Sequence, residues 1–409
     1  MYVLHINCVY PYGSTGKITA SIHHTVCDSG ERSFVIYGRG RKSDAPLTKK
    51  VGCELLAKYN NVRSRVCGDP YGGCFLSTSQ LLQFLRMQRP DVVHLQCMNG
   101  FFANIPRVIL FLKEHHIPTV LTLHAEFLYT GNCAHAGSCE RWKVGCGHCP
   151  RLREATGSLL LDRTASEFRR MYDAFHGFSE LTVVGVSEWI CQRASVSPIL
   201  REHRICKINN GIDLRVFSDR YDRGRVRENL KTGQRKLVLL VTPSFDPAKG
   251  SDLFFALVDA MHALPFQFAV AGADAPAGYC GDVVFLGNVK DQTELAAYYG
   301  AADVVVCCSR YETYPTVCLE AAACGTPVVG FDVGGEAEAV HNGIGDVVAL
   351  GDIPAMKQKV LEYSARPKAY WKQVLSGKRD QLSDTRMSQA YIALYEQLLE
   401  KQHETEKNV

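Results

Sequence analysis

The sequence has little net charge, no long apolar run and no low-complexity tract before its charged last residues. Its 409 residues carry 46 Lys and Arg against 42 Asp and Glu, a net charge of +4, which is too balanced to indicate a nucleic-acid-binding protein. No segment reaches the ~20 consecutive apolar residues that a membrane-spanning helix needs. The start, Met1–Asn7, is typical of a strand and lacks the basic and long apolar regions of a secretory signal. We therefore expect a cytoplasmic protein that binds no nucleic acid and contacts the inner face of a membrane at most peripherally.

Basic residues nevertheless cluster in the middle of the chain. The cluster consists of Arg201, Arg204, Lys207, Arg215, Arg220, Arg223, Arg225 and Arg227. Most runs of this kind are solvated faces, and the alternative is contact with an anionic membrane surface. Both interpretations stay open at this point.

Seventeen cysteines are expected to be mostly reduced and buried in a cytosolic chain. Four of them depart from that pattern, because they are spaced Cys-x5-Cys-x6-Cys-x2-Cys around Trp142. These four are Cys133, Cys139, Cys146 and Cys149. Their number and the final Cys-x2-Cys favour a tetrahedral structural zinc site. Reduced thiols and disulfides are the alternatives.

Strand-length apolar runs alternate with helix-length segments along the chain, as in a parallel sheet with helices on both faces. The predicted strands are Val3–Val9, Ser33–Tyr37, Asp91–Gln96, Thr119–Leu123, Leu181–Val186, Lys236–Thr242, Phe266–Gly272, Val283–Leu286, Asp303–Cys308 and Pro327–Phe331. Their continuous apolar character indicates burial on both faces of the sheet. The length suits two domains.

We therefore predict an α/β protein with two doubly wound, Rossmann-like domains that face each other across a cleft. The first domain is expected over residues 1–205, with a Cys-rich insert at 130–150, and the second over residues 206–385. Residues 386–409 contain a helical spacing of apolar residues over Ser388–Lys401. They are expected to form a closing helix that packs back on the first domain, followed by a charged tail.

The strongest chemical signal is the segment Arg310–Val329, in which a predicted strand leads through a loop into a helix. Glu312 lies in the loop, and Pro315 suits the first position of the helix. The free amides of the first helical turn form an anion site that can take a pyrophosphate. Glu320 follows on the helix, where its carboxylate can accept two hydroxyls such as those of a ribose. Each Glu alone is common, but their spacing around a helix start favours a nucleotide site.

This Glu-x7-Glu pattern resembles the signature of the retaining GT-B glycosyltransferases of family 4. The resemblance implies that Glu312 contacts the donor sugar at its reacting face and that Glu320 holds the nucleotide ribose. Other donor contacts that it implies are Asn288, Val289, Tyr314, Pro315 and Thr316. Weaker matches along the chain extend the resemblance from Met1 to about Tyr395.

A second strand–loop–helix segment, Val241–Gly250, carries Lys249, a point charge available to a diphosphate. Ser251 is a plausible cap of the following helix. Family members often pair this Lys with an Arg near the start of the loop, where the present sequence has Ser244. One cation then faces a leaving group of about two charges, so we expect Arg310 or a helix N-terminus to compensate.

The first predicted domain contributes glycines to the donor site. Gly13-Ser14-Thr15-Gly16-Lys17 lacks the first Gly and the final Ser or Thr of a P-loop, which argues against an ATPase. The flexible Gly13 and Gly16 instead allow the backbone to approach the donor sugar, as the corresponding loop does in the family.

His124 directly follows a predicted strand, and this placement raises the chance that it is functional rather than structural. The family's His at this motif contacts the donor sugar, which implies the same role for His124. The neighbouring Ala125 replaces an Asp that is frequent in relatives. The block Thr130–Pro150 resembles a subset of family 4 enzymes that build bacterial surface polysaccharides, and we expect it to shape the acceptor side.

Together these features predict an enzyme that moves a hexose-type sugar, with retention, from a nucleotide-diphosphate donor to a glycan or lipid-linked acceptor. Lys249 and the helix start at Pro315 would stabilise the leaving diphosphate, while Glu312 and His124 orient the sugar. No Asp-x-Asp motif occurs where GT-A enzymes need one, so we expect catalysis without a divalent ion or other cofactor. A non-hydrolysing sugar-nucleotide 2-epimerase of the same architecture and a non-catalytic sugar-nucleotide sensor are the alternatives.

Overall fold

The computed structural model describes residues 1–341 and 343–407, and the chain divides into two compact units. The N-terminal unit comprises Met1–Asn209 and the last part of the chain from Met387 on, and the C-terminal unit comprises Asn210–Arg386. The boundaries expected near residues 205 and 385 lie close to these. Among the described residues, no helix combines the length and the hydrophobicity that crossing a membrane requires.

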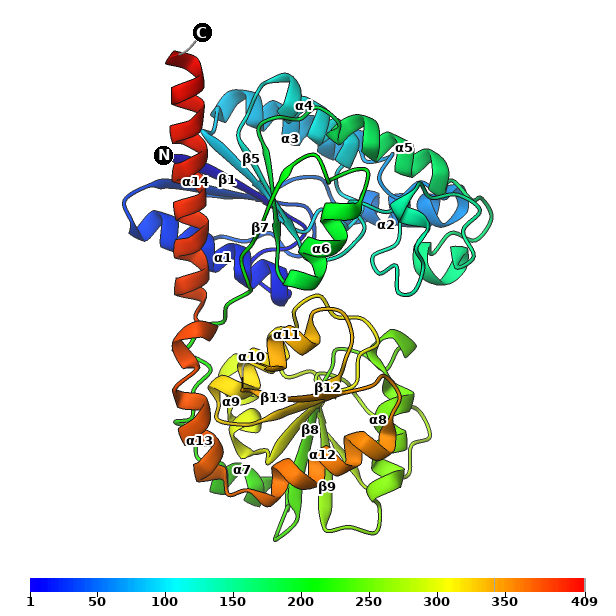
Figure 1. The fold of residues 1–409 in the computed structure, drawn as a ribbon, viewed down its shortest axis with the longest axis vertical. Coiled ribbons are helices and arrows are strands. Elements are labelled where there is room, and N and C mark those ends of the chain that lie inside the picture. Colours follow the sequence, from blue (N-terminus) through cyan, green and yellow to red (C-terminus); the bar gives the residue numbers. More distant parts are fainter. Residues whose placement is uncertain (342, 408–409) are drawn as a thin grey trace. The chain divides into compact units, whose positions relative to one another are not determined.

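The N-terminal unit is built on a seven-stranded parallel sheet of order β3-β2-β1-β4-β5-β6-β7 (Figure 1). Its strands are β1 Tyr2–Asn7, β2 Arg32–Tyr37, β3 Thr48–Lys50, β4 Val92–Leu95, β5 Thr119–Leu123, β6 Leu181–Gly185 and β7 Arg204–Lys207. Its helices are α1 Gly13–Asp28, α2 Glu54–Cys67, α3 Phe75–Gln88, α4 Ile105–Glu114, α5 Thr164–Phe175 and α6 Glu188–Val196, joined by most of α14 Asp384–Lys407.

The C-terminal unit has a six-stranded parallel sheet of order β10-β9-β8-β11-β12-β13. Its strands are β8 Lys236–Val241, β9 Phe266–Ala271, β10 Val283–Phe285, β11 Val304–Cys307, β12 Val328–Phe331 and β13 Gly345–Val348. Its helices are α7 Arg223–Asn229, α8 Ser251–Met261, α9 Gln292–Ala301, α10 Thr316–Ala323, α11 Glu336–His341, α12 Ile353–Ala365 and α13 Lys368–Ser376. The prediction of two doubly wound α/β domains is therefore confirmed.

All ten predicted strands are present, with ends that differ by at most two residues from the prediction. The central strands β4, β5, β11 and β12 are buried along their whole length, which is why their sequences are continuously apolar. Strands β3, β7 and β13 were not predicted from the sequence. Each of these lies at the edge of a sheet, where one side is unpaired and a short, more polar strand suffices.

The predicted closing helix lies within α14, which packs against the N-terminal sheet and α1. Tyr391 and Tyr395 are fully buried in one apolar cluster with Val3, Val92 and Ile22. Figure 1 shows α14 running beside α1 and the start of β1. The last helix of the chain is therefore part of the N-terminal core.

Candidate active site

The candidate donor site lies at the carboxyl ends of the strands of the C-terminal sheet. All six strands are parallel, so the loops that follow them leave the sheet on the same side, where open α/β sheets bind ligands. The loop after β8 carries Ser244 and Lys249, the loop after β11 carries Glu312, and the loop after β10 carries Asn288. The fold thus gathers residues that are far apart in the sequence.

Lys249 and Glu312 form an ion pair on this side of the sheet, with 3.0 Å between Nζ and Oε1. Both side chains are partly buried, at 35% and 21% exposure. Burial lowers the pKa of Lys249, but the Glu312 carboxylate more than offsets it, so this pKa lies above its usual value. The structure therefore places a firmly protonated cation beside the carboxylate that the sequence assigned to the sugar.

Glycines let the two loops approach each other. Gly250 has φ +68°, and a Cβ there would lie 1.7 Å from the Cys308 carbonyl oxygen at the end of β11. Gly334 has φ +58°, and a Cβ there would lie 1.8 Å from the Glu312 carbonyl oxygen. That same oxygen accepts a 3.0 Å hydrogen bond from the Gly335 N–H. The loop that follows β12 therefore packs against the backbone of Glu312 and bonds to it.

Helix α10 begins beside this pair. It starts at Thr316, with Pro315 as the residue before the helix, so the expectation that Pro315 takes the first helical position is off by one residue. The N-cap residue is this proline, which makes no side-chain hydrogen bond to the first turn, and the backbone amides of a first helical turn can receive an anion. The preceding Tyr314 is buried, and its carbonyl accepts a 3.2 Å hydrogen bond from Asn210.

Glu320 is only 8% exposed, and its Oε2 accepts a 2.9 Å hydrogen bond from the Tyr299 hydroxyl. Glu320 is therefore not a solvated carboxylate on the helix surface. A buried carboxylate already held by one hydroxyl has a fixed orientation. Tyr299, on α9, is a supporting residue that no sequence pattern indicated.

The phosphate side of the site shows two contacts that the sequence did not predict. Arg310 makes a bidentate ion pair with Asp252, at 2.7 and 2.6 Å, and also donates to the Pro247 carbonyl at 2.6 Å. Arg310 is therefore held by the segment that carries Lys249, and its compensation for Ser244 stays a prediction. Ser251 is the first residue of α8 and not its cap; its hydroxyl donates to the Phe245 carbonyl at 3.2 Å.

Ser244 itself lies in the loop after β8, where its hydroxyl donates to Asp246. Asp246 also accepts a 3.0 Å hydrogen bond from the backbone N–H of Lys249. The Ser244 hydrogen bond, the largest cause, and the Lys249 contacts keep the pKa of Asp246 below its usual value. This carboxylate therefore orders the short turn that presents Lys249.

Two of the predicted donor contacts, Asn288 and Val289, lie on the loop after β10. Asn288 is exposed and Val289 is half-buried. Gly287, with φ +64°, precedes them, and its carbonyl accepts a 2.8 Å hydrogen bond from Gly272 at the end of β9. These residues lie, like Lys249 and Glu312, in loops at the carboxyl ends of the strands.

Glu336 is a buried carboxyl that the sequence did not single out. It is 0% exposed, and neither oxygen has a hydrogen-bond partner among the described residues. Burial is the main cause that raises its pKa well above the usual value, and the charge of Glu312 acts in the same direction. The nearby Lys249 ammonium acts in the opposite direction, and its ion pair is with Glu312.

In the N-terminal unit, Gly13 and Gly16 lie in the first turns of α1 and not in a loop, so the expectation of a flexible glycine loop is wrong. A Cβ on Gly16 would lie 3.1 Å from the Val9 carbonyl oxygen. Gly16 therefore lets α1 begin close against the end of β1. The assignment of both glycines to the donor sugar stays a prediction.

His124 lies at the carboxyl end of β5 and donates from Nε2 to the Gln96 side chain at 2.8 Å. Burial lowers the pKa of His124 to about 4, so the ring is neutral at neutral pH. Beside it, the His94 ring bonds to Tyr395 at 2.6 Å and to Thr122 at 2.8 Å. The closing helix thus reaches the polar interior next to His124, a link that the sequence did not reveal.

The four cysteines of the predicted zinc site are brought together. Cys133, Cys139, Cys146 and Cys149 all line one small cavity within the insert. Every cysteine of the chain is free, so the disulfide alternative is not realised in this structure.

Part of the basic cluster is used inside the C-terminal unit. Arg223 and Arg227 both pair with the buried Asp303, at 2.6 and 3.0 Å. Arg215 pairs with Asp213 at 2.9 Å. These three arginines therefore have structural partners.

A surface cavity of about 610 Å³ lies elsewhere, at the amino-terminal ends of β5 and β6. Pro118, Leu181 and Lys401 are among its lining residues. His124 follows the other, carboxyl end of β5, so we do not count the cavity as part of the candidate site.

Residues 235–365 match the family model described as glycosyl transferases group 1. This segment is a glycosyl transferases group 1 domain. It contains Lys249, Glu312, Glu320 and Glu336, the residues around which the candidate donor site is built.

Relatives of the whole chain point the same way. WcaC of Escherichia coli (strain K12), a glycosyl transferase assigned to colanic acid biosynthesis, is 24% identical over 88% of this chain and 90% of its own. The solved structure of Anabaena Alr3699/HepE in complex with UDP-glucose has a TM-score of 0.63 and 15% identity, covering 97% of this chain and 100% of that one. WaaG, a glycosyltransferase involved in lipopolysaccharide biosynthesis, has a TM-score of 0.64 and 15% identity, covering 97% and 99%. The structures show that the fold is that of GT-B glycosyltransferases, and the group 1 domain with WcaC supports a glycosyltransferase.

Proposed function

We propose that this protein is a retaining hexosyltransferase that takes its sugar from a nucleotide diphosphate donor and passes it to a glycan or lipid-linked oligosaccharide in bacterial surface-polysaccharide synthesis. The ion pair of Lys249 with Glu312, set beside the start of α10, is the observation that carries the proposal. The group 1 domain, the similarity to WcaC and the UDP-glucose bound by Alr3699/HepE support it.

The donor would bind along the carboxyl edge of the C-terminal sheet. Its diphosphate would take the Lys249 ammonium and the first-turn amides of α10, where positive charge is concentrated. Its ribose hydroxyls would donate to the Glu320 carboxylate. The base would contact the loop at Asn288 and Val289, and Pro315 and Thr316 would border the phosphates.

The reaction would proceed through loss of the nucleoside diphosphate from the anomeric carbon and attack by the acceptor hydroxyl on the same face. The carbon–oxygen bond to phosphate breaks as an oxocarbenium-like centre forms, and the departing phosphate oxygen takes the acceptor proton. Lys249 would stabilise the negative charge that grows on the leaving group. Glu312 would face the positive charge on the sugar, with His124 as a neutral hydrogen-bonding group that orients it.

No cofactor is part of this scheme. The chain lacks an Asp-x-Asp motif at the place where GT-A enzymes bind a divalent ion, and Lys249 with the α10 amides would supply the positive charge in its stead. We propose catalysis that is independent of a divalent metal, which addition of EDTA to the assay tests directly.

The test begins with nucleotide recognition. Thermal shifts of the full chain with UDP, GDP, ADP and CMP should single out one nucleoside diphosphate, since a ligand at 100 times its Kd adds about 2.7 kcal/mol of stability. The matching nucleotide sugar is then incubated with an acceptor extract, and the anomeric configuration of the product is read by NMR. Full transfer by Glu312→Ala at saturating donor, or an epimerised donor formed without acceptor, would contradict the proposal.

Peripheral contact with an anionic membrane is part of the proposal because a lipid-linked acceptor resides there. The exposed Arg201 and Arg204 of the N-terminal unit would supply charge. Cosedimentation with phosphatidylglycerol vesicles should fall steeply with added salt and should be absent with phosphatidylcholine alone. Equal binding to both vesicles would exclude it.

A further inference from the structure

We propose that the Cys-rich insert of the N-terminal unit is a structural zinc site with Cys133, Cys139, Cys146 and Cys149 as its four ligands. This inference is independent of the glycosyl transfer proposed above. It rests on the place of the thiols in the fold and on what otherwise holds this segment together.

The four thiols surround a single cavity of about 20 Å³, a space of the size of one water molecule or ion. Trp142, Arg141 and Pro150 also line it. Four cysteines around one ion-sized space supply the complete tetrahedral ligand set of a structural zinc site. No described residue of another unit is needed.

The sulfurs are not yet at ligand spacing. Among the described residues, Cys307, Cys318 and Glu336 form the one set whose ligand atoms all lie within 4.8 Å of one another. That set comes from β11, α10 and α11 and is buried. The insert cysteines are partly exposed, so an ion can reach them more readily.

The segment between β5 and α5 has little else to hold it. It contains only a 3-10 turn, Arg141–Lys143, and a π turn, Leu152–Thr156. Four large apolar side chains of the segment are exposed: Val144 at 89%, Leu159 at 51%, Leu160 at 70% and Leu161 at 46%. A long segment with so little regular structure is a situation in which proteins use a metal or disulfides.

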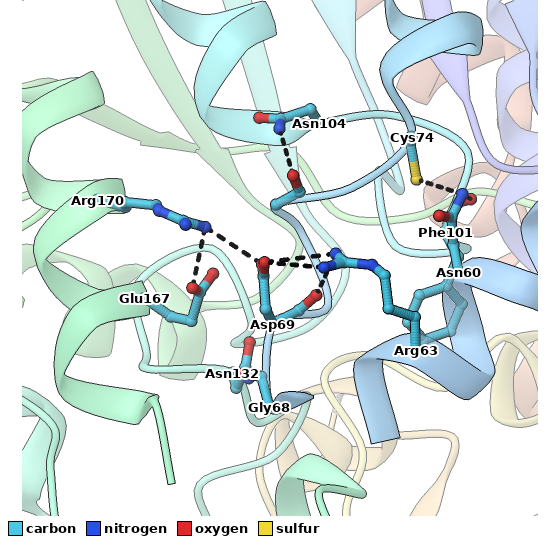
Figure 2. A network of polar contacts seen from close by, with 11 residues as sticks. Asn60, Arg63, Gly68, Asp69, Cys74, Phe101, Asn104, Asn132, Glu167 and Arg170 are labelled. Atoms are coloured by element: carbon cyan, nitrogen blue, oxygen red, sulfur yellow. Dashed lines mark hydrogen bonds and ion pairs between the residues drawn. The ribbon is translucent and has the colours of Figure 1, made fainter. Parts of the chain in front are cut away.

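The two ends of this segment are fixed by polar contacts, which leaves its middle to the thiols. Figure 2 shows Asp69 between the guanidinium groups of Arg63 and Arg170, at 3.3 and 3.2 Å, with Glu167 of α5 bonded to Arg170 at 3.0 Å. Next to this network, the Asn132 side chain donates to the Gly68 carbonyl at 3.3 Å (Figure 2). The anchored Asn132 directly precedes Cys133.

The middle of the segment is folded around the cavity. Gly131 donates its backbone N–H to the Cys146 sulfur at 3.1 Å, the kind of hydrogen bond that steadies a metal-bound thiolate. A Cβ on Gly131 would lie 2.5 Å from the Cys146 Cβ, so only glycine allows this approach. Gly145 and Gly147, with φ +124° and +148°, form the turn between Cys146 and its neighbours.

The insert also docks on α6 through residues beside the ligands. Trp142 is 1% exposed and donates to the Cys139 carbonyl at 2.8 Å. The Arg193 guanidinium of α6 lies 4.6 Å from the Trp142 ring and 2.6 Å from the Glu126 carboxylate. A zinc ion would therefore fix the position of a tryptophan that joins the insert to the rest of the unit.

The first experiment measures metal in the full chain. Protein purified without chelator should contain one zinc per chain by mass spectrometry of the metal, and Cys139→Ser and Cys146→Ser should lose it. Cys53→Ser and Cys280→Ser are the controls, because these exposed cysteines lie outside the insert, and they should keep it. Wild type with no zinc above the buffer blank after incubation with Zn²⁺, or insert variants that retain it, would overturn the proposal.

The second experiment needs no variant and so is not affected by misfolding. Co²⁺ exchanged into the wild type should give the intense thiolate-to-cobalt absorption and the visible bands of a tetrahedral site. Removal of the ion with a thiol-reactive mercurial should make trypsin cut at Arg141 and Lys143 and change the Trp142 fluorescence. A thiol count in denaturant that falls four short of the seventeen cysteines would show two disulfides instead, and a visible spectrum as purified would show an iron–sulfur cluster; either result would refute zinc.

Discussion

The Lys249 ammonium lies 3.0 Å from the Glu312 carboxylate, although the two residues are 63 positions apart in the sequence. The pair unites the cation expected at the diphosphate with the carboxylate expected at the sugar. Because Glu312 holds Lys249 in place, a donor bound as proposed above would have to share or displace this contact. On that proposal, the ion pair would couple donor binding to the orientation of Glu312.

Replacing Glu312 with Gln should separate catalysis from binding. The variant loses the charge that faces the developing positive sugar, so we expect kcat to fall by about 10²–10³-fold. Its affinity for the nucleoside diphosphate should be unchanged or higher, since Lys249 loses its competing partner. Steady-state kinetics and calorimetry measure the two effects, and Glu228→Gln, an exposed carboxylate of the same unit, is the control.

Replacing Lys249 with Met should weaken the binding of phosphate specifically. A charge-assisted hydrogen bond contributes roughly 1.5–3 kcal/mol, so the Kd of the nucleoside diphosphate should rise by about 10–100-fold while that of the nucleoside stays the same. Lys290→Met removes an exposed charge nearby and should have little effect. Equal losses for nucleoside and diphosphate would place Lys249 away from the phosphates.

Glu320 should accept hydrogen bonds from the ribose hydroxyls of the nucleotide. Its Gln variant keeps an oxygen for the Tyr299 hydroxyl and should fold normally, but it loses the charged acceptor. We expect the discrimination between the ribonucleotide and its 3′-deoxy analogue to shrink by about 1–2 kcal/mol. Competition binding with both nucleotides measures this difference. An unchanged ratio of the two affinities would show that Glu320 does not contact the ribose.

Gly334→Ala should be much more harmful than Gly351→Ala. Both glycines have left-handed backbone, with φ +58° and +83°, and an Ala at either should cost about 1–2 kcal/mol for this reason alone. Only at Gly334 would the new Cβ also meet the Glu312 carbonyl oxygen, at 1.8 Å. Urea unfolding should show a loss of at least about 2 kcal/mol beyond that of Gly351→Ala, with activity lost in parallel.

Acid should destabilise the N-terminal unit through its buried histidines. Burial lowers the pKa of His5 to about 3 and those of His23 and His124 to about 4, from 6.5. The unfolded chain therefore binds more protons than the folded one as pH falls from 6.5 toward 4, so stability is complete above pH 6.5 and declines through that window.

A variant pair tests this assignment. His23→Gln should reduce the loss of unfolding free energy on acidification by up to about 1.4 kcal/mol per pH unit. The substitution of the exposed His262, His262→Gln, should leave this loss unchanged. Urea unfolding of both variants at pH 7, 6 and 5 measures the slopes. Identical slopes would mean that His23 is not the group responsible.

The sequence by itself determined the two parallel sheets and the segments that carry the candidate chemistry. Strands such as β4 and β11 are buried on both faces, so their composition alone identified them. Glu312 and Glu320 lie close together along the chain around one helix start, which made their pattern visible. The edge strands β3, β7 and β13 escaped detection because burial on fewer sides places weaker demands on composition.

Tertiary structure alone decided which partners these residues have. It paired Arg310 with Asp252, joined His124 to Gln96, and placed Gly16 against Val9. It also brought Lys249 to Glu312, because the loops after β8 and β11 leave the same edge of the sheet. Such contacts depend on how strands are ordered in space, and the composition of a single segment carries no information about its neighbours.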